Sequence, residues 1–107
     1  MDQVKEITVH QLKEWMDTDK NFQLIDVREP YEHEMANIEG ELIPLSEIIS
    51  QKDKINQNED VVVYCRSGMR SASAIIALQK LGYNNLYNLK GGIITYAQEI
   101  DPSIPQY

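Results

Sequence analysis

Val61-Val62-Val63-Tyr64-Cys65-Arg66-Ser67-Gly68-Met69-Arg70-Ser71 is the stretch of sequence that decides the fold. Its first four residues are β-branched or aromatic, which favours a strand covered on both faces, as in a parallel sheet. The apolar side chains that follow, up to Leu81, recur at helical spacing, and Gly82 is typical of a helix end. Cys65 is therefore expected at the carboxyl end of a strand, facing the amino end of a helix. Open α/β sheets bind ligands at this position.

Strand and helix patterns alternate along the rest of the chain. The expected strands are residues 22–27, 41–43, 61–64 and 86–89, preceded by a short apolar start at Ile7. The expected helices begin after a capping-box pattern at Thr8 and Gln11, and then cover residues 31–35, 47–49, 72–81 and 93–100. This alternation predicts one α/β domain over residues 1–107, with a central, mostly parallel five-stranded sheet and helices on both faces. Residues 101–107 contain two prolines and are expected to form an irregular tail.

Composition narrows the classes of partner. The chain has 107 residues and a formal net charge of −7, which argues against nucleic acid or an anionic membrane as the main partner. No segment is apolar and long enough to span a membrane, and the first six residues do not resemble a signal peptide. A single cysteine cannot form an internal disulfide, so a reducing cytoplasm is the expected location.

The loop from Cys65 to Arg70 has the composition of an anion-binding site. If the loop curls around a centre, its backbone N–H groups point inward, and Gly68 supplies a position that tolerates positive φ. Arg66 and Arg70 add positive charge, while the hydroxyls of Ser67 and Ser71 can donate hydrogen bonds. All of these groups favour the charged form of the sulfur, so we expect the pKa of Cys65 to be lowered. A thiolate at neutral pH is a strong nucleophile that attacks an anion bound in the same loop.

Other interpretations of the polar residues are less specific. A lone cysteine is most often a buried apolar residue, but two arginines and a glycine would not then be expected beside it. Asp26 and Arg28, at the end of the strand that begins at Phe22, are expected to form a structural ion pair or loop anchor. His10 and His33, with one distant cysteine, do not make a ligand set, so no metal is expected.

Two kinds of nucleophilic chemistry fit a cysteine in such a loop. Cysteine phosphatases use Cys-x-x-x-x-x-Arg, with five residues between the nucleophile and the arginine. Only four residues separate Cys65 from Arg70, and this smaller loop suits the terminal sulfur of a persulfide better than a tetrahedral phosphate. No aspartate near the loop is an obvious general acid for a leaving alkoxide. The spacing favours sulfur, with a phosphatase or arsenate reductase as the alternative enzyme and a non-catalytic interaction module as the alternative outside catalysis.

The sequence as a whole resembles the rhodanese-like sulfurtransferases. The similarity is carried by the motifs Cys65-Arg66-Ser67-Gly68-Met69-Arg70-Ser71, Leu24-Ile25-Asp26-Val27-Arg28-Glu29, Ile38-Glu39-Gly40-Glu41 and Gly91-Gly92-Ile93, and it extends from Ile7 to about Ile100. The resemblance implies that Cys65 takes sulfane sulfur from a donor such as thiosulfate or a protein persulfide and passes it to a nucleophilic acceptor. It also implies that Arg66 and Arg70 bind the anionic end of the donor, and that the amides of the loop, including those of Ser67, Gly68 and Met69, stabilise the persulfide.

The same resemblance implies no metal or organic cofactor, and structural roles for Asp26, Arg28 and Ser71. Two positions depart from the family pattern: Asn37 stands where histidine is usual, and Tyr96 replaces a common tryptophan. Other segments are similar to rhodanese domains fused behind molybdopterin-synthase-type adenylyltransferases, which deliver sulfur to a small carrier protein. The chain is thus expected to be either a free-standing sulfurtransferase or a sulfur-delivery domain of a larger enzyme.

Overall fold

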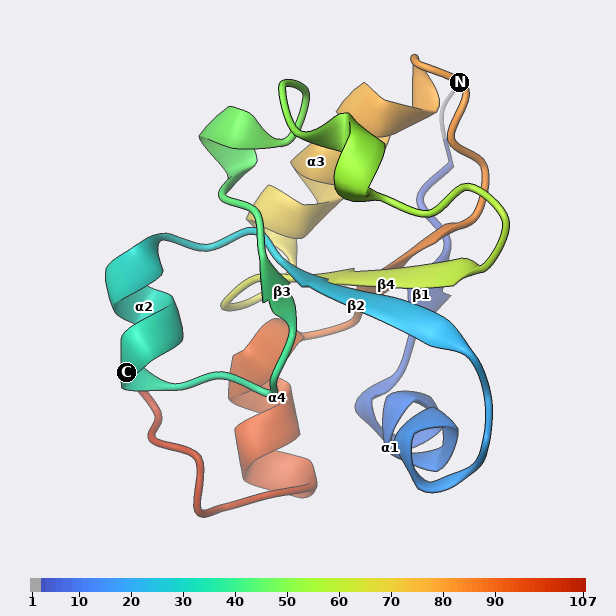
Figure 1. Ribbon diagram of the computed structural model, residues 1–107. Coiled ribbons are helices and arrows are strands. Elements are labelled where there is room, and N and C mark those ends of the chain that lie inside the picture. The colour runs from blue at the N-terminus through green and yellow to red at the C-terminus, as the bar shows by residue number, and fades with distance from the viewer. Residues whose placement is uncertain (1–2) are drawn as a thin grey trace.

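In the part of the chain that the structure describes, five parallel strands form one sheet, seen edge-on in Figure 1. The computed structural model describes residues 3–107. The strands are β1 (Glu6–Ile7), β2 (Phe22–Asp26), β3 (Glu41–Leu42), β4 (Asp60–Tyr64) and β5 (Leu86–Leu89), and their order in the sheet is β1-β5-β4-β2-β3. Every pairing between neighbouring strands is parallel, so the expectation of a mostly parallel sheet is confirmed.

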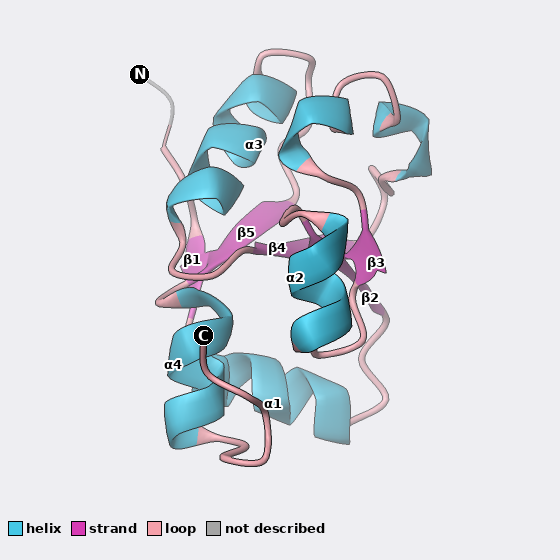
Figure 2. Ribbon diagram, turned by 90° about the vertical axis from the view of Figure 1, so that its left-hand side faces the viewer, coloured by secondary structure: helices cyan, strands magenta, loops and turns pink. Residues whose placement is uncertain are grey.

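Helices cover both faces of the sheet (Figure 2). They are α1 (Val9–Asp17), α2 (Pro30–Met35), α3 (Met69–Gln79) and α4 (Gly92–Glu99), together with the 3₁₀ helices η1 (Leu45–Glu47) and η2 (Lys52–Lys54). The 3₁₀ helices and α3 lie over one face, and α1 and α4 lie over the other. Helix α2 and the C-terminal tail lie in front of the carboxyl ends of the central strands.

The central strand β4 shows why the sheet is covered on both faces. Val61, Val62, Val63 and Tyr64 are all fully buried, as the run of β-branched and aromatic residues predicts. Successive side chains of a strand point to opposite faces. Val61 and Val63 accordingly pack into the core under α3, while Val62 and Tyr64 pack into the core under α1 and α4. Because β4 is buried on both faces, the loop that follows Tyr64 begins in the interior of the protein.

Several element boundaries differ from those expected. Residues 47–49 do not form a helix capped by Ser46; instead a single 3₁₀ turn begins after Pro44. Helix α3 begins at Met69, directly after Gly68, so part of the expected loop is the first turn of the helix. The capping box at Thr8 and Gln11 is confirmed.

Within residues 3–107, none of the helices combines the length and the apolar character needed to cross a bilayer.

Candidate active site

Cys65 occupies the junction between β4 and α3, as the sequence predicts. The residue follows the last residue of the most buried strand, and its side chain is only 1% exposed. Gly68 has φ of 111°, a conformation that L-residues with a side chain rarely adopt, and it turns the backbone into the first turn of α3. The loop therefore closes over the sulfur within four residues and leaves the thiol shielded from bulk water.

Three hydrogen bonds converge on the sulfur atom. The backbone N–H groups of Gly68 and Ser71 donate to Cys65 Sγ at 3.1 and 3.4 Å, and the Ser71 hydroxyl lies 3.3 Å from the same atom. Two amides and a hydroxyl directed at one buried sulfur stabilise negative charge there, because each is a hydrogen-bond donor to the thiolate. The loop thus has the donor arrangement that the sequence predicts for an anion site.

Burial and hydrogen bonding act in opposite directions on the acidity of Cys65. Burial raises the pKa of the thiol, but the hydrogen bonds of Ser71, through its hydroxyl and its amide, lower the pKa, as do the amides of Gly68 and Ser67. The net result is a lowered pKa. A smaller attraction between the thiolate and the Arg70 guanidinium acts in the same direction. The acidity of this cysteine therefore depends more on neutral hydrogen-bond donors than on the two arginines to which the sequence pointed.

Asn88 of β5 is a site residue that local sequence patterns do not reveal. Its register partner in β4 is Val63, two residues before the cysteine, so its buried side chain reaches the loop from the neighbouring strand. Asn88 Oδ1 lies 2.5 Å from the Ser71 hydroxyl, and Asn88 Nδ2 donates to the carbonyl of Gly68 at 3.0 Å. This asparagine therefore fixes both the loop and the hydroxyl that touches the sulfur.

The two loop arginines are held by different partners. Arg70 donates two parallel hydrogen bonds to the buried carboxylate of Glu32 in α2, at 2.7 and 2.9 Å. That bidentate pair is the main reason that the pKa of Glu32 falls to about 2, despite the opposing effect of burial. Arg66 is exposed and donates to the backbone oxygen of Tyr107, with its guanidinium 5.2 Å from the tyrosine ring. The structure thus gives each arginine a partner within the chain.

Asp26 and Arg28 form a fully buried ion pair at the end of β2. Arg28 Nε and Nη2 donate to the two oxygens of Asp26 at 2.9 and 2.8 Å. The guanidinium also donates to the carbonyl of Ala36 at 2.6 Å and to the Tyr107 hydroxyl at 2.7 Å. His33 Nδ1 is 2.8 Å from Asp26 Oδ2. Every side-chain oxygen of Asp26 and every side-chain nitrogen of Arg28 makes a hydrogen bond, and these bonds connect α2 and the tail to the sheet. Neither carboxylate oxygen of Asp26 is left free to accept a proton from a substrate.

Helix α4 supports the loop from beneath. The backbone N–H groups of Ile93 and Ile94 donate to the carbonyls of Cys65 and Arg66 at 3.0 and 3.2 Å. Gly92 permits this approach, because a Cβ atom there would lie 2.2 Å from the Arg66 carbonyl oxygen and 2.7 Å from that of Cys65. Glycine is therefore required at position 92, where the backbone of α4 lies against that of the loop.

The remaining residues expected at the site lie on the outer surface of the loop. Ser67 is exposed, and Met69 exposes 79% of its surface. Within residues 3–107, no cluster of three or more histidine, cysteine or acidic side chains has the geometry of a metal site. The arrangement as a whole is a shielded, acidified thiol with backbone donors around it, which is the chemistry of a cysteine nucleophile.

Comparison with known proteins identifies the class. The family model of the rhodanese-like domain matches residues 8–99, and the chain belongs to that family. It is 38% identical over 104 residues to the probable adenylyltransferase/sulfurtransferase MoeZ of Mycobacterium tuberculosis, a match that covers 94% of this chain but only 26% of that protein. A protein of Allochromatium vinosum named sulfurtransferase is 36% identical, with 89% of this chain and 90% of that one covered.

Solved structures agree on the fold. The rhodanese-like domain protein of Staphylococcus aureus superimposes with a TM-score of 0.83 at 28% identity, covering 97% of this chain and 99% of that one. The chain is therefore a rhodanese-like α/β domain, homologous to the rhodanese domains of MoeZ-type enzymes, as the sequence motifs predict.

Proposed function

We propose that this chain is a sulfurtransferase that carries sulfane sulfur as a persulfide on Cys65. The observation that carries the proposal is the shielded sulfur with amide donors from Gly68 and Ser71 and a lowered pKa. The sulfurtransferase name of similar proteins supports the same class of reaction. Burial of the sulfur also suits a persulfide, because exclusion of water protects a reactive intermediate from side reactions.

The first step takes sulfur from a donor such as thiosulfate. The Cys65 thiolate attacks the outer sulfur of the donor, a new sulfur–sulfur bond forms to Cys65, and the sulfur–sulfur bond within thiosulfate breaks. Sulfite leaves with the electron pair of the broken bond, so the total charge is conserved and no external oxidant is needed. The donors that stabilise the thiolate then face the persulfide, whose terminal sulfur carries the negative charge.

The second step returns the enzyme to its thiolate form. A nucleophilic acceptor, which is cyanide in the usual assay, attacks the terminal sulfur of the persulfide and forms a bond to it. The bond between the two sulfurs breaks, and its electron pair returns to Cys65. A carrier protein or another acceptor protein is thus the proposed partner, with a small sulfur donor such as thiosulfate or a protein persulfide as the proposed source. A reducing cytoplasm is the proposed setting, since it keeps the single thiol free.

The two arginines have unequal roles in this proposal. Arg66 is exposed, and its guanidinium donates to the backbone oxygen of Tyr107, a contact that supports a role in binding the oxygens of a donor. We assign it to the anionic end of the donor. Arg70 is shared with Glu32, so its charge is largely balanced, and its contribution is to hold the first turn of α3 in place as well as to attract the donor.

The test compares the wild type with Cys65→Ser in thiosulfate:cyanide transfer and in mass spectrometry after incubation with thiosulfate. We expect the wild type to gain the mass of one sulfur atom and to form thiocyanate, and the variant to do neither. Equal activity of the two proteins would end the proposal.

Arg66 is the arginine whose substitution tests donor binding without disturbing the fold. Arg66→Ala is expected to weaken donor use in an intact fold. Arg70→Ala, in contrast, also leaves Glu32 buried without its partner. Unchanged donor kinetics in Arg66→Ala would remove the role assigned to Arg66. Hydrolysis of an aryl phosphate that is lost in Cys65→Ser would instead favour the phosphatase alternative.

A further inference from the structure

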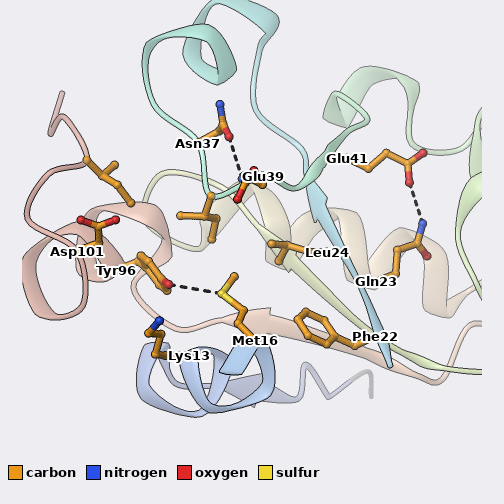
Figure 3. Close-up of a pocket in the computed structure, with 12 residues that line it drawn as sticks. Lys13, Met16, Phe22, Gln23, Leu24, Asn37, Glu39, Glu41, Tyr96 and Asp101 are labelled. Atoms are coloured by element: carbon orange, nitrogen blue, oxygen red, sulfur yellow. Dashed lines mark hydrogen bonds between the residues drawn. The ribbon is translucent and has the colours of Figure 1, made fainter. Parts of the chain in front are cut away.

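A groove of about 700 Å³ lies on the face of the sheet covered by α1 and α4 (Figure 3), and Cys65 is not among the residues that line it. Its floor is apolar and is made by Met16, Phe22, Leu24 and Ile38. These side chains belong to the second core, and the first three are only partly buried, so apolar surface is left accessible. The groove opens beside the amino half of β2, whereas Cys65 follows the carboxyl end of β4, so the two sites are distinct.

Negative charges surround this apolar floor. Glu39, Glu41 and Asp101 line the groove from the turn before β3, from β3 itself and from the start of the tail. The cation that lines it, Lys13, is paired with Asp17 at 2.9 Å. The whole chain carries a formal charge of −7, so the wider field has the same sign as the groove.

Glu39 holds its position at a conformational cost. Its φ is 66°, and within residues 3–107 no other residue except glycine adopts a positive φ. Asparagine or glycine would be easier to place there, since a longer side chain is strained in this region. Within residues 3–107, the carboxylate of Glu39 has no cation partner, so an ion pair within the fold does not explain this charge.

Tyr96 presents a buried polar atom to the groove. The side chain is 6% exposed, and its hydroxyl contacts only the sulfur of Met16, at 3.5 Å, among the described residues (Figure 3). A thioether is a weak acceptor, and the phenol oxygen accepts no hydrogen bond from residues 3–107, so it is available to a donor on a ligand. Asn37, which lines the same groove, is the other position at which the chain departs from the family pattern.

We propose that this groove binds a short segment of a partner protein in which an apolar side chain is flanked by lysine or arginine. The apolar residue would cover Phe22 and Leu24, the flanking cations would pair with Glu39, Glu41 and Asp101, and an N–H of the segment would donate to Tyr96. Charge complementarity selects this occupant, because nucleic acid and anionic membranes are repelled by three carboxylates. The volume is within the range of pockets that take a few side chains, roughly 300–1,000 Å³.

The test titrates isotope-labelled protein with two blocked hexapeptides, Lys-Arg-Leu-Leu-Arg-Lys and Glu-Asp-Leu-Leu-Asp-Glu. We expect the basic peptide to shift the backbone amide resonances of residues 22–24, 37–41 and 101–104 in a saturable manner, and the acidic peptide to shift none of them. Trp15, the single tryptophan, packs 5.5 Å from Phe22 and provides a fluorescence signal for the dissociation constant.

Variants then test the role of the charges. Glu39→Gln and Glu41→Gln should each weaken binding of the basic peptide by about two- to five-fold, the range expected for a partly exposed ion pair. Asp53→Asn is the matched control, since it removes one charge from a side chain that is 96% exposed and lies in η2, on the other face of the sheet. Glu39→Asn should in addition raise the melting temperature, because asparagine tolerates the left-handed conformation.

Several results would overturn the proposal. They are equal binding of the two peptides, shifts that map to the Cys65 loop instead of the groove, or an equal loss of affinity in Asp53→Asn and Glu39→Gln. Cys65→Ser should bind the basic peptide as the wild type does, so this experiment succeeds or fails independently of the sulfur-transfer proposal.

Discussion

The hydroxyl of Ser71 has one proton and two possible acceptors. Cys65 Sγ lies 3.3 Å from it and Asn88 Oδ1 lies 2.5 Å from it. Asn88 cannot exchange its oxygen and nitrogen freely, because its Nδ2 donates to the Gly68 carbonyl. When Cys65 is neutral, we expect the proton of Ser71 to point to Asn88; when Cys65 is ionised, we expect the proton to turn to the sulfur. Ionisation of Cys65 should therefore be coupled to a rotation of this hydroxyl.

Ser71→Ala removes the coupling and raises the pKa of Cys65. A hydrogen bond to a charged acceptor contributes about 1.5–3 kcal/mol, and a bond to a neutral acceptor about 0.5–1.5 kcal/mol. Since the hydroxyl gives up Asn88 to serve the thiolate, the net stabilisation lost in the variant is about 1 kcal/mol, or about five-fold in the ionisation constant of the thiol. The wild-type thiolate therefore persists to lower pH than that of the variant.

The measurement is the far-ultraviolet absorbance of the thiolate as a function of pH. Cys65 is the only cysteine, so a Cys65→Ser blank isolates its signal. Ser73→Ala, an exposed serine two residues further along α3, is the matched control and should titrate as the wild type. A midpoint in Ser71→Ala equal to or below that of the wild type would refute the reasoning. A lower midpoint would mean that the hydroxyl keeps its proton on Asn88 and stabilises the neutral thiol.

Three further predictions concern stability, measured by urea unfolding. Gly92→Ala should lower the free energy of unfolding by about 3 kcal/mol or more, because the added Cβ meets backbone atoms. Gly82→Ala, with nothing within 4 Å of its Cβ, should lower it by only about 1–2 kcal/mol, and similar losses in the two variants would contradict this account. The pKa of Glu32 is about 2, below its ordinary value, so its ionised form stabilises the fold above pH 4.5, and about 2–3 kcal/mol should be lost as the pH falls from 4.5 to 2. A Glu32→Gln variant with the same acid sensitivity would disprove that assignment. Tyr107→Phe should cost about 1–2 kcal/mol, since its hydroxyl bridges two buried charged groups, while the exposed Tyr31→Phe should change little; equal effects would argue against the bridge.

Local sequence patterns were sufficient to predict those features of this protein that depend on the backbone conformation of neighbouring residues. The run of β-branched residues before Cys65 and the glycine three residues after it predict a buried strand and a tight loop, because pleat and φ are properties of neighbouring residues. The alternation of strands and helices likewise predicts a parallel sheet. The position of Cys65 in front of a helix follows from the same local rules. The boundaries at residues 45–49 were wrong, since a single turn carries too few residues for periodicity to separate 3₁₀ from α.

Tertiary structure decided which groups touch the sulfur and what the arginines do. Asn88 reaches the loop only because β5 pairs with β4, and Glu32 binds Arg70 only because α2 lies beside the start of α3. The groove at Glu39 is formed by two segments that are far apart in the sequence, residues 13–41 and 96–104. Periodicity reports the environment of one element at a time, whereas these contacts depend on the order of strands in the sheet. The sequence by itself therefore determined the buried strand, the loop after it and the place of Cys65 between strand and helix. The packing of distant segments determined which groups contact the sulfur, which groups hold the loop, and the groove at Glu39.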